Sequence, residues 1–556
     1  MGLLNHISTK SADSIKGDLF GGLTAAVIAL PMALAFGVAS GAGAEAGLWS
    51  AVFIGLFAAL FGGTPTLISE PTGPMTVVMT AVIANLTASN PENGMAMAFT
   101  VVMLAGVFQI ILGALRLGRY ITQMPYTVIS GFMSGIGCIL ITLQLGPALG
   151  QTAPPGGVMG TLQNLPQLAA GVQPWEFALA AITVAILWFT PQRFKKVIPP
   201  QLLALVMGTV ISLVLVPALN SSGEEIRRIG EISAGFPELQ MPFFGISEWR
   251  LMLTDAAVLG LLGCIDALLT SVVADSLTRT EHNSNKELVG QGLGNLVAGL
   301  FGGIPGAGAT MGTVVNIQTG GRSALSGIVR AVVLMLVILV GSGLAARIPL
   351  AVLAGIALKV GFDIVDWGFL KRAHRISVKG ALILYLVIGL TVLVDLIVAV
   401  AVGVFLANIL TIDRLSQRQG DAVKSISTAD DDLNLPQEEK ALLDAGEGRV
   451  LLFQLMGDMI FGVAKTIGRE HNAIGQCNAI VFDLGAVSHL GVTAALALEN
   501  AVEEAVEAKR HVYVVGAVGT TRERLKKLKL FELLPPDHTQ LSRAQALAAA
   551  VETIKG

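Results

Sequence analysis

Long apolar stretches recur along the chain from about Phe20 to Asn408, separated by short polar connections. A helix needs about 20 mostly apolar residues to cross a bilayer, and an ordinary soluble domain does not contain so many such stretches. Two more segments are shorter and are broken by Gly and Pro, so we expect them not to cross as complete helices. The pattern predicts a polytopic α-helical membrane protein with 14 segments: 20–38, 47–63, 73–87 (broken), 96–115, 125–147, 175–190, 199–217, 252–276, 288–302, 309–318 (broken), 327–345, 348–361, 379–394 and 395–410.

Charged residues are unevenly distributed along this chain. They make up 13% of it, yet residues 411–556 hold 36 of them, from totals of 36 Lys and Arg and 39 Asp and Glu. A soluble domain is roughly a quarter charged, so this tail has a soluble composition and the rest does not. We expect a cytoplasmic N-terminal segment at 1–17, a transmembrane transport domain at 18–410, a linker or start of the soluble part at 411–447, and a soluble domain at 448–556. The composition excludes an ordinary soluble enzyme, a disordered chain and a nucleic-acid-binding protein.

Lysine and arginine mark the side of the membrane on which the connections lie. If both ends of the chain are inside, most basic connections between the predicted segments are inside too, whereas the outer connections 88–95 and 148–174 contain neither residue. The outer connection 218–250 is an exception, because it contains Arg227, Arg228 and Arg250. The pattern predicts a multi-pass protein with both termini in the cytoplasm, and we expect it to reside in the plasma (inner) membrane.

An internal repeat relates the two halves of the membrane part. Leu60-Phe-Gly-Gly-Thr-Pro65 recurs as Leu300-Phe-Gly-Gly-Ile-Pro305, and the tripeptide Thr76-Val-Val78 recurs as Thr313-Val-Val315. With seven segments in each half, the two copies have opposite orientations in the membrane. Broken helices at matching positions of such inverted halves indicate a transport site near the middle of the membrane. We therefore expect a 7+7 inverted repeat.

The two broken segments are typical of an anion site. In Ser69-Glu-Pro-Thr-Gly-Pro-Met75, Pro74 suits the first turn of a helix, which puts Thr72 or Gly73 at the helix start. The second segment, Gly306-Ala-Gly-Ala-Thr-Met-Gly312, contains glycines that allow the backbone to approach a ligand. Two helices that begin near the membrane centre would direct their N–H groups at one place, and this binds an anion without a basic side chain. The alternative is a pair of kinks filled by neighbouring helices.

Asp266 and Thr270 lie four residues apart in an apolar stretch, so one helix face presents both oxygens. An ionisable residue inside a membrane span is costly and is by default functional. A carboxylate, a hydroxyl and unwound backbone carbonyls suit a hard cation such as Na⁺. Two alternatives stay open: Asp266 carries a proton, or the pair stabilises helix packing. For the remaining intramembrane charges a structural role is favoured: Glu70 as a brace of the first broken helix, Asp395 as a cap or bridge, and Lys359, Asp363 and Asp366 at an interface.

The tail alternates short apolar strands with helical patterns. Strands are predicted at Val450–Leu455, Ala479–Asp483 and His511–Val515, and helices at 459–471, 491–508, 521–531 and 541–553. This alternation is typical of an α/β domain with a mainly parallel sheet. The segment Val487–Thr493 follows a predicted strand and opens a helix, and a capped surface turn is favoured there over a phosphate site.

Three stretches resemble the SulP family of anion transporters: Asp18-Leu-Phe-Gly-Gly-Leu-Thr-Ala-Ala-Val-Ile-Ala-Leu-Pro31, Pro71-Thr-Gly-Pro74 and Pro305-Gly-Ala-Gly-Ala-Thr310. The tail resembles that family's STAS domain. Three further stretches, Glu70–Val78, Gly263–Glu287 and Trp367–His374, are similar to the family's Na⁺-dependent bicarbonate transporters. The resemblance implies a 14-helix inverted repeat with core and gate domains and a C-terminal α/β STAS domain, usually assembled as a homodimer.

The resemblance also implies ligand positions. Bicarbonate would bind between Thr72 and the helix start at Ala309–Thr310, and Na⁺ near Asp266, Thr270, Gly308 and Thr310. Many family members have an arginine where this chain has Gly312, and a glutamine where it has Met32. Without that fixed cation, a bound Na⁺ becomes the natural charge partner of the anion.

The resulting hypothesis is Na⁺-dependent bicarbonate uptake by alternating access, with Na⁺ as the coupling ion and no organic cofactor. One alternative is a proton-coupled or exchanging sulfate or dicarboxylate transporter. Another is a membrane anion sensor that signals through the STAS domain, which is also where a cytoplasmic regulator would bind. An enzyme is not expected, because no nucleophile–base pair and no cluster of metal ligands appears.

Overall fold

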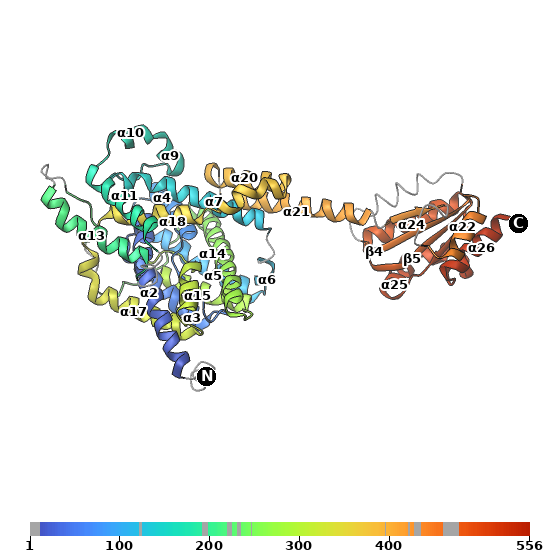
Figure 1. The fold of residues 1–556 in the computed structure, drawn as a ribbon, viewed down its shortest axis with the longest axis horizontal. Helices are drawn as coiled ribbons and strands as arrows, with labels where there is room; N and C mark the ends of the chain where they lie inside the picture. The colour runs from blue at the N-terminus through green and yellow to red at the C-terminus, as the bar shows by residue number, and fades with distance from the viewer. Residues whose placement is uncertain are drawn as a thin grey trace. The chain divides into compact units, whose positions relative to one another are not determined.

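The computed structural model describes residues 12–121, 125–191, 198–219, 225–230, 235–245, 247–394, 396–420, 423–427, 435–459 and 477–555. The chain divides into two compact units, residues 1–404 and 405–556 (Figure 1). The first contains helices and one two-stranded ribbon, and the second contains a four-stranded sheet.

Each of the fourteen predicted membrane segments contains a helix. In the part of the chain that the structure describes, six helices are long and apolar enough to cross a membrane. The broken segments form shorter helices, and the second has only 9 residues, or about 14 Å, less than half the thickness of a bilayer core. The helices are α2 (Ala12–Ser40), α3 (Ala44–Phe61), α4 (Gly73–Ser89), α5 (Gly94–Ala114), α7 (Tyr126–Leu143), α11 (Pro174–Phe189), α13 (Pro200–Leu219), α14 (Trp249–Thr278), α15 (Ser284–Leu300), α16 (Thr310–Gln318), α17 (Ala324–Ala345), α18 (Leu350–Ile364), α20 (Val378–Leu393) and α21 (Leu396–Gly420), with the short α6 (Gly118–Ile121), α8 (Leu145–Ala148), α9 (Gly157–Gln163), α10 (Leu165–Ala170) and α19 (Trp367–Ile376) in the connections.

Helix α15 packs against α3, α5 and α14 in the first unit (Figure 1). Small residues allow this close packing: a Cβ on Gly106 of α5 would lie 2.5 Å from the carbonyl oxygen of Gly292 of α15, and the reverse distance is also 2.5 Å. Small residues at such crossings let helix backbones approach in a membrane. The polar side chains that α15 buries are therefore held close to their partners on the neighbouring elements.

The two broken segments meet as an antiparallel ribbon of strands β1 (Ser69–Glu70) and β2 (Ala307–Gly308). Ser69 pairs with Gly308 and Glu70 pairs with Ala307, so the ribbon has the two-fold register expected of inverted copies. A Cβ on Gly306 would lie 2.4 Å from the carbonyl oxygen of Glu70, so this position requires glycine. Helices α4 and α16 start directly after the two strands, and the ribbon fixes their starts next to each other.

The second unit contains a mixed sheet in the order β3-β4-β5-β6. Strand β3 is antiparallel to β4, and the other two pairs are parallel, which confirms the mainly parallel α/β prediction. Alternating residues of the strands contribute to two separate hydrophobic clusters, one with α24 and one with α22 and α26. The elements are β3 (Val423–Ile426), α22 (Gln437–Ala445), β4 (Val450–Met459), β5 (Ala479–Leu490), α24 (Val492–Glu507), β6 (His511–Val515), α25 (Gly519–Lys527), η1 (Leu530–Leu533), η2 (Pro536–Thr539) and α26 (Arg543–Lys555).

Two boundaries in this unit differ from the prediction. Strand β5 continues through Leu490, because β4 runs to Met459 and supplies a parallel partner along the added length. The segment Val487–Thr493 is therefore mostly strand rather than a turn after one. The helix predicted at 459–471 lies almost entirely outside the described residues, and its first residue ends β4.

Residues 411–447, which we expected to be a linker or the start of the soluble part, contribute β3 and α22 to this unit. Glu439 of α22 and Asp483 of β5 both pair with Arg543 of α26, at 2.7 and 3.1 Å. Burial alone would lower the pKa of Arg543, but the hydrogen bonds and charges of the two carboxylates raise it overall. This charge cluster joins α22 and α26 to the sheet.

Candidate functional site

A cavity of about 540 Å³ lies where the two broken helices begin. Residues of the β1–α4 and β2–α16 segments, of α2 and α14, and of α7, α11, α13 and α18 line it. Most of the sequence-predicted site residues meet here. The lining residues include Met32, Glu70, Thr72, Gly73, Asp266, Gly308, Ala309, Thr310, Met133, Leu187, Gln201, Ile356, Lys359, Val360, Asp363 and Ile364.

Asp266 is held at the cavity wall by a residue of the first broken segment. The hydroxyl of Thr72 donates a hydrogen bond to Asp266 Oδ2 at 2.8 Å, and both residues are 8% exposed. No Lys or Arg in the described part of the chain forms an ion pair with Asp266. The Asp266 carboxylate is therefore buried at the cavity wall, where the Thr72 hydroxyl donates a hydrogen bond to it.

Three oxygens from the second half lie together along α14 and the second broken segment. The hydroxyl of Thr270 donates to the carbonyl oxygen of Gly308 at 2.9 Å, and it lies 2.9 Å from the hydroxyl of Thr310. Gly308 and Thr310 line the cavity, whereas Thr270 is fully buried behind them. Carboxylate, carbonyl and hydroxyl oxygens form a donor set that suits a hard cation.

The two helices that follow the ribbon, α4 and α16, are called the half-helices here, and both begin without a side-chain cap. Thr72 occupies the N-cap position of α4, but its hydroxyl bonds to Asp266 and not to the helix. Ala309 at the N-cap of α16 has no side chain that could accept a hydrogen bond. The first-turn N–H groups are thus left to a ligand in the cavity, and the positive ends of both helix dipoles favour an anion there.

Two predicted supporting positions differ in their surroundings. Met32 lines the cavity, as expected of a residue near the ligand. Gly312 does not line it: Gly312 is buried, and a Cβ there would lie 3.1 Å from Ile68 Cγ2. A long cationic side chain at 312 would need this packing to rearrange.

Sequence reasoning missed Arg330, which is fully buried in α17 and forms an ion pair with Glu70. It assigned Lys359 and Asp363 to an interface, whereas this pair, joined at 2.5 Å, lines the cavity from α18. Asp366 instead caps α19. Asp395 lies outside the described residues. A charge inside an apolar stretch was the available signal for Arg330.

A stripe of three buried polar residues on α15, at intervals of four, holds the segments that lead into the broken helices. Gln291 donates to the hydroxyl of Ser69, and Asn295 bonds with both the N–H and the carbonyl of Gly306. Glu287 accepts from the N–H groups of residues 63 and 64, both at 2.8 Å. Helix α15 therefore positions both half-helices through hydrogen bonds to the segments that precede them.

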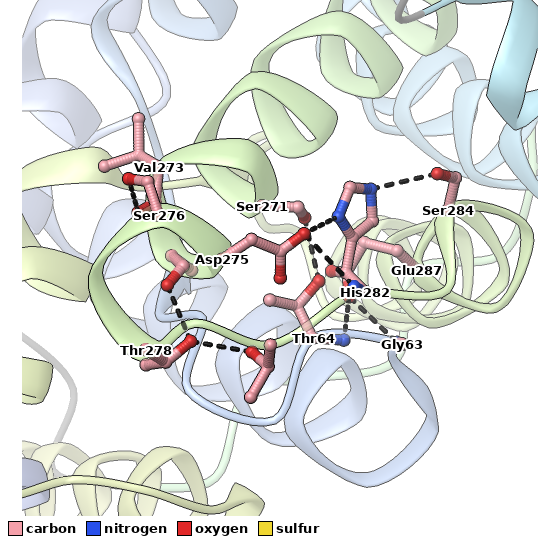
Figure 2. A network of polar contacts seen from close by, with 12 residues as sticks. Gly63, Thr64, Ser271, Val273, Asp275, Ser276, Thr278, His282, Ser284 and Glu287 are labelled. Atoms are coloured by element: carbon pink, nitrogen blue, oxygen red, sulfur yellow. Dashed lines mark hydrogen bonds and ion pairs between the residues drawn. The ribbon is translucent and has the colours of Figure 1, made fainter.

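Figure 2 shows the end of this stripe, where α14 turns into α15. Asp275 binds the imidazole of His282 at 2.6 Å, and the other ring nitrogen lies 2.9 Å from the hydroxyl of Ser284. Thr64 lies 2.8 Å from Ser271 of α14. This network connects the segment before β1 to the helix that carries Asp266.

We expect Glu287→Ala to destabilise the protein, because it leaves the partly buried N–H of Gly63 and the buried N–H of Thr64 without an acceptor. An unsatisfied buried donor costs about 1–3 kcal/mol, so the expected loss of stability is about 1–6 kcal/mol. Thermal unfolding of the detergent-solubilised protein measures it. Glu281→Ala, at an exposed position of the same connection, is the matched control. Equal melting temperatures for the two variants would contradict the positioning role of Glu287.

Two of the three basic residues that depart from the loop-charge pattern have structural partners. Arg227 pairs with the buried Glu176 of α11 at 2.7 Å. Arg228 donates to the hydroxyl of Ser212 at 3.1 Å. These contacts tie the residues into the fold, so they carry little information about the orientation of their loop.

Comparison with known proteins gives consistent results over almost the whole chain. The model of the "Sulfate permease family" matches residues 15–387, and the STAS domain model matches 444–546. "Bicarbonate transporter BicA" of Picosynechococcus sp. is 71% identical over 97% of this chain and 95% of that protein. Its namesake from Synechocystis sp. is 69% identical over 97% and 94%.

Solved structures give the same picture. The transmembrane domain of a cyanobacterium bicarbonate transporter BicA is 72% identical, with a TM-score of 0.66 over 70% of this chain and 97% of that one. Murine Solute Carrier 26 family member A9 is 19% identical with a TM-score of 0.82, over 98% of this chain and 92% of that one, and shares the fold. The prediction of a polytopic α-helical membrane protein with a C-terminal α/β STAS domain is confirmed, and the relatives are named as transporters rather than enzymes. This chain is a multi-pass membrane protein that belongs to the sulfate permease family and has a C-terminal STAS domain.

Proposed function

We propose that this protein takes up bicarbonate together with Na⁺ by alternating access. The observation that carries the proposal is one cavity that combines a buried carboxylate with two uncapped helix starts. The names of the relatives that are about 70% identical support bicarbonate as the substrate.

The anion would bind to the first-turn N–H groups of α4 and α16, near Thr72, Gly73, Ala309 and Thr310. Lys359 lines the same cavity, but Asp363 already neutralises its charge in this structure. The helix ends therefore provide most of the positive potential for a small monovalent anion.

The cation would bind to Asp266, the carbonyl of Gly308 and the hydroxyls of Thr310 and Thr270. A bound ion would replace the hydrogen bond between Thr270 and Gly308 and turn the hydroxyl oxygen toward itself. Because the described contacts of Asp266 include no basic side chain, Na⁺ would balance its charge and make the site favourable for an anion.

The wider arrangement is part of the proposal. Residues 18–410 form the transport domain and residues 448–556 the STAS domain, joined by 411–447, with 1–17 as a cytoplasmic segment. The protein resides in the plasma membrane as a homodimer with cytoplasmic termini, and a cytoplasmic regulator acts on the STAS domain. In each transport cycle the cavity opens to one side of the membrane at a time.

The test is uptake of radiolabelled bicarbonate into proteoliposomes over a series of Na⁺ concentrations, with and without excess sulfate. We expect uptake that requires Na⁺ and resists competition by sulfate. Uptake driven by a pH gradient and blocked by sulfate would instead support a proton-coupled sulfate or dicarboxylate transporter. Bicarbonate binding without flux would support a sensor.

A further inference from the structure

Arg330 is a positively charged side chain that is buried inside the first unit. It is 0% exposed, and its guanidinium donates to the carbonyl oxygens of Ala51 and Ser69, both at 3.0 Å, and to Glu70. A buried arginine is costly in a membrane span unless its charge is compensated. Glu70 supplies the compensating charge, so the Glu70–Arg330 pair is neutral as a unit.

Glu70 lies between this arginine and the candidate anion site. It lines the cavity, whereas Arg330 does not. Its Oε1 lies 3.7 Å from the position of a Cβ on Gly312, in the first turn of α16. One carboxylate therefore neutralises the guanidinium behind it and weakens the positive potential of the helix start beside it.

The formal charges around the cavity give a reason why anion binding would need a bound cation such as Na⁺ in addition to Arg330 and Lys359. Lys359 and Asp363 cancel, and so do Glu70 and Arg330. Asp266 remains and gives the surroundings of the cavity a net charge of −1. Without Glu70, the same cavity would be neutral before any ion entered.

We propose that Glu70 sets the sodium requirement of anion binding by neutralising Arg330. Arg330 is a fixed positive charge. While Glu70 is ionised, it cancels the charge of Arg330, and a mobile cation must then supply the positive potential that the anion needs. This inference rests on the proposed function and adds the residue that makes coupling necessary.

The Glu70→Gln variant tests the inference while keeping the side-chain shape, because the amide oxygen still accepts from Arg330. In proteoliposomes we expect the half-saturating Na⁺ concentration for bicarbonate uptake to fall about tenfold or more. With choline in place of Na⁺, we also expect bicarbonate to raise the melting temperature of Glu70→Gln but not of the wild type. This second measurement reports binding and does not depend on transport.

Three further variants separate charge from shape. Glu70→Asp retains the carboxylate and should retain the Na⁺ requirement. The double variant Glu70→Gln, Arg330→Gln removes both charges and should restore it. Glu176→Gln removes a buried carboxylate from another arginine pair, away from the cavity, and should leave the half-saturating Na⁺ concentration unchanged.

A wild-type Na⁺ requirement in Glu70→Gln, in both measurements, would overturn the inference. So would an equal fall in Glu70→Asp, because that would make side-chain shape the cause. Absence of Na⁺-dependent bicarbonate uptake in the wild type would instead contradict the proposed function itself. The wild-type measurement therefore distinguishes a failure of the proposed function from a failure of this inference.

Discussion

Replacing Asp266 by Asn is expected to abolish Na⁺-driven bicarbonate uptake. The amide has the same shape and can still accept the hydrogen bond from Thr72, so the wall of the cavity should remain intact. What it loses is the negative charge that would hold the cation. Removing one partner of a buried charge pair costs about 3–5 kcal/mol, or roughly 100-fold or more in apparent Na⁺ affinity.

Initial rates of bicarbonate uptake over a wide range of Na⁺ concentrations measure this effect. Asp255→Asn is the matched control, because it makes the same change about three turns earlier on α14, away from the cavity. Unchanged stimulation by Na⁺ in Asp266→Asn would refute the cation site. A wild-type protein that responds to pH gradients and not to Na⁺ would make Asp266 a proton carrier.

Replacing Ala309 by Asp is expected to stabilise the protein and at the same time to abolish transport. Asp is among the best N-cap residues, and it should stabilise α16 by about 0.5–2 kcal/mol relative to Ala. The same carboxylate would occupy the proposed anion position. Two like charges about 4 Å apart repel by about 4 kcal/mol at the effective dielectric of a protein surface, which corresponds to roughly 1000-fold weaker anion binding.

Two measurements on Ala309→Asp decide this prediction: a melting temperature at or above that of the wild type, and uptake at background. Ala309→Ser caps the helix without adding charge and should lower uptake far less than Ala309→Asp does. Gly491→Asp adds an N-cap charge to α24 of the soluble unit and should leave bicarbonate affinity unchanged. Normal uptake by Ala309→Asp would place the anion elsewhere.

The helices could be predicted from sequence because their signal is local. An apolar stretch long enough to cross a bilayer can be identified without knowing its neighbours, and this holds for α14 with Asp266 inside it. The starts of α4 and α16 could be predicted for the same reason, since Pro74 and the glycines before Met311 mark breaks within a few residues. The repeated hexapeptide then related the two breaks to each other.

Partners that are distant in sequence could not be predicted. Glu70 and Arg330 are 260 positions apart, so neither residue identifies the other. Strands of two residues, such as β1 and β2, are too short for any periodic pattern. Most residues of helix α22 are charged or polar, which is typical of a linker, although Leu443 is fully buried in the soluble core.

The backbone ribbon of β1 and β2 also restricts how the transporter can move. Ser69 and Glu70 pair through their main chains with Gly308 and Ala307, so one half-helix cannot tilt without carrying the other. Ile356 and Val360 of α18 also line the cavity. If the anion and the cation bind as proposed, both would contact the two half-helices that this ribbon joins and would move with them.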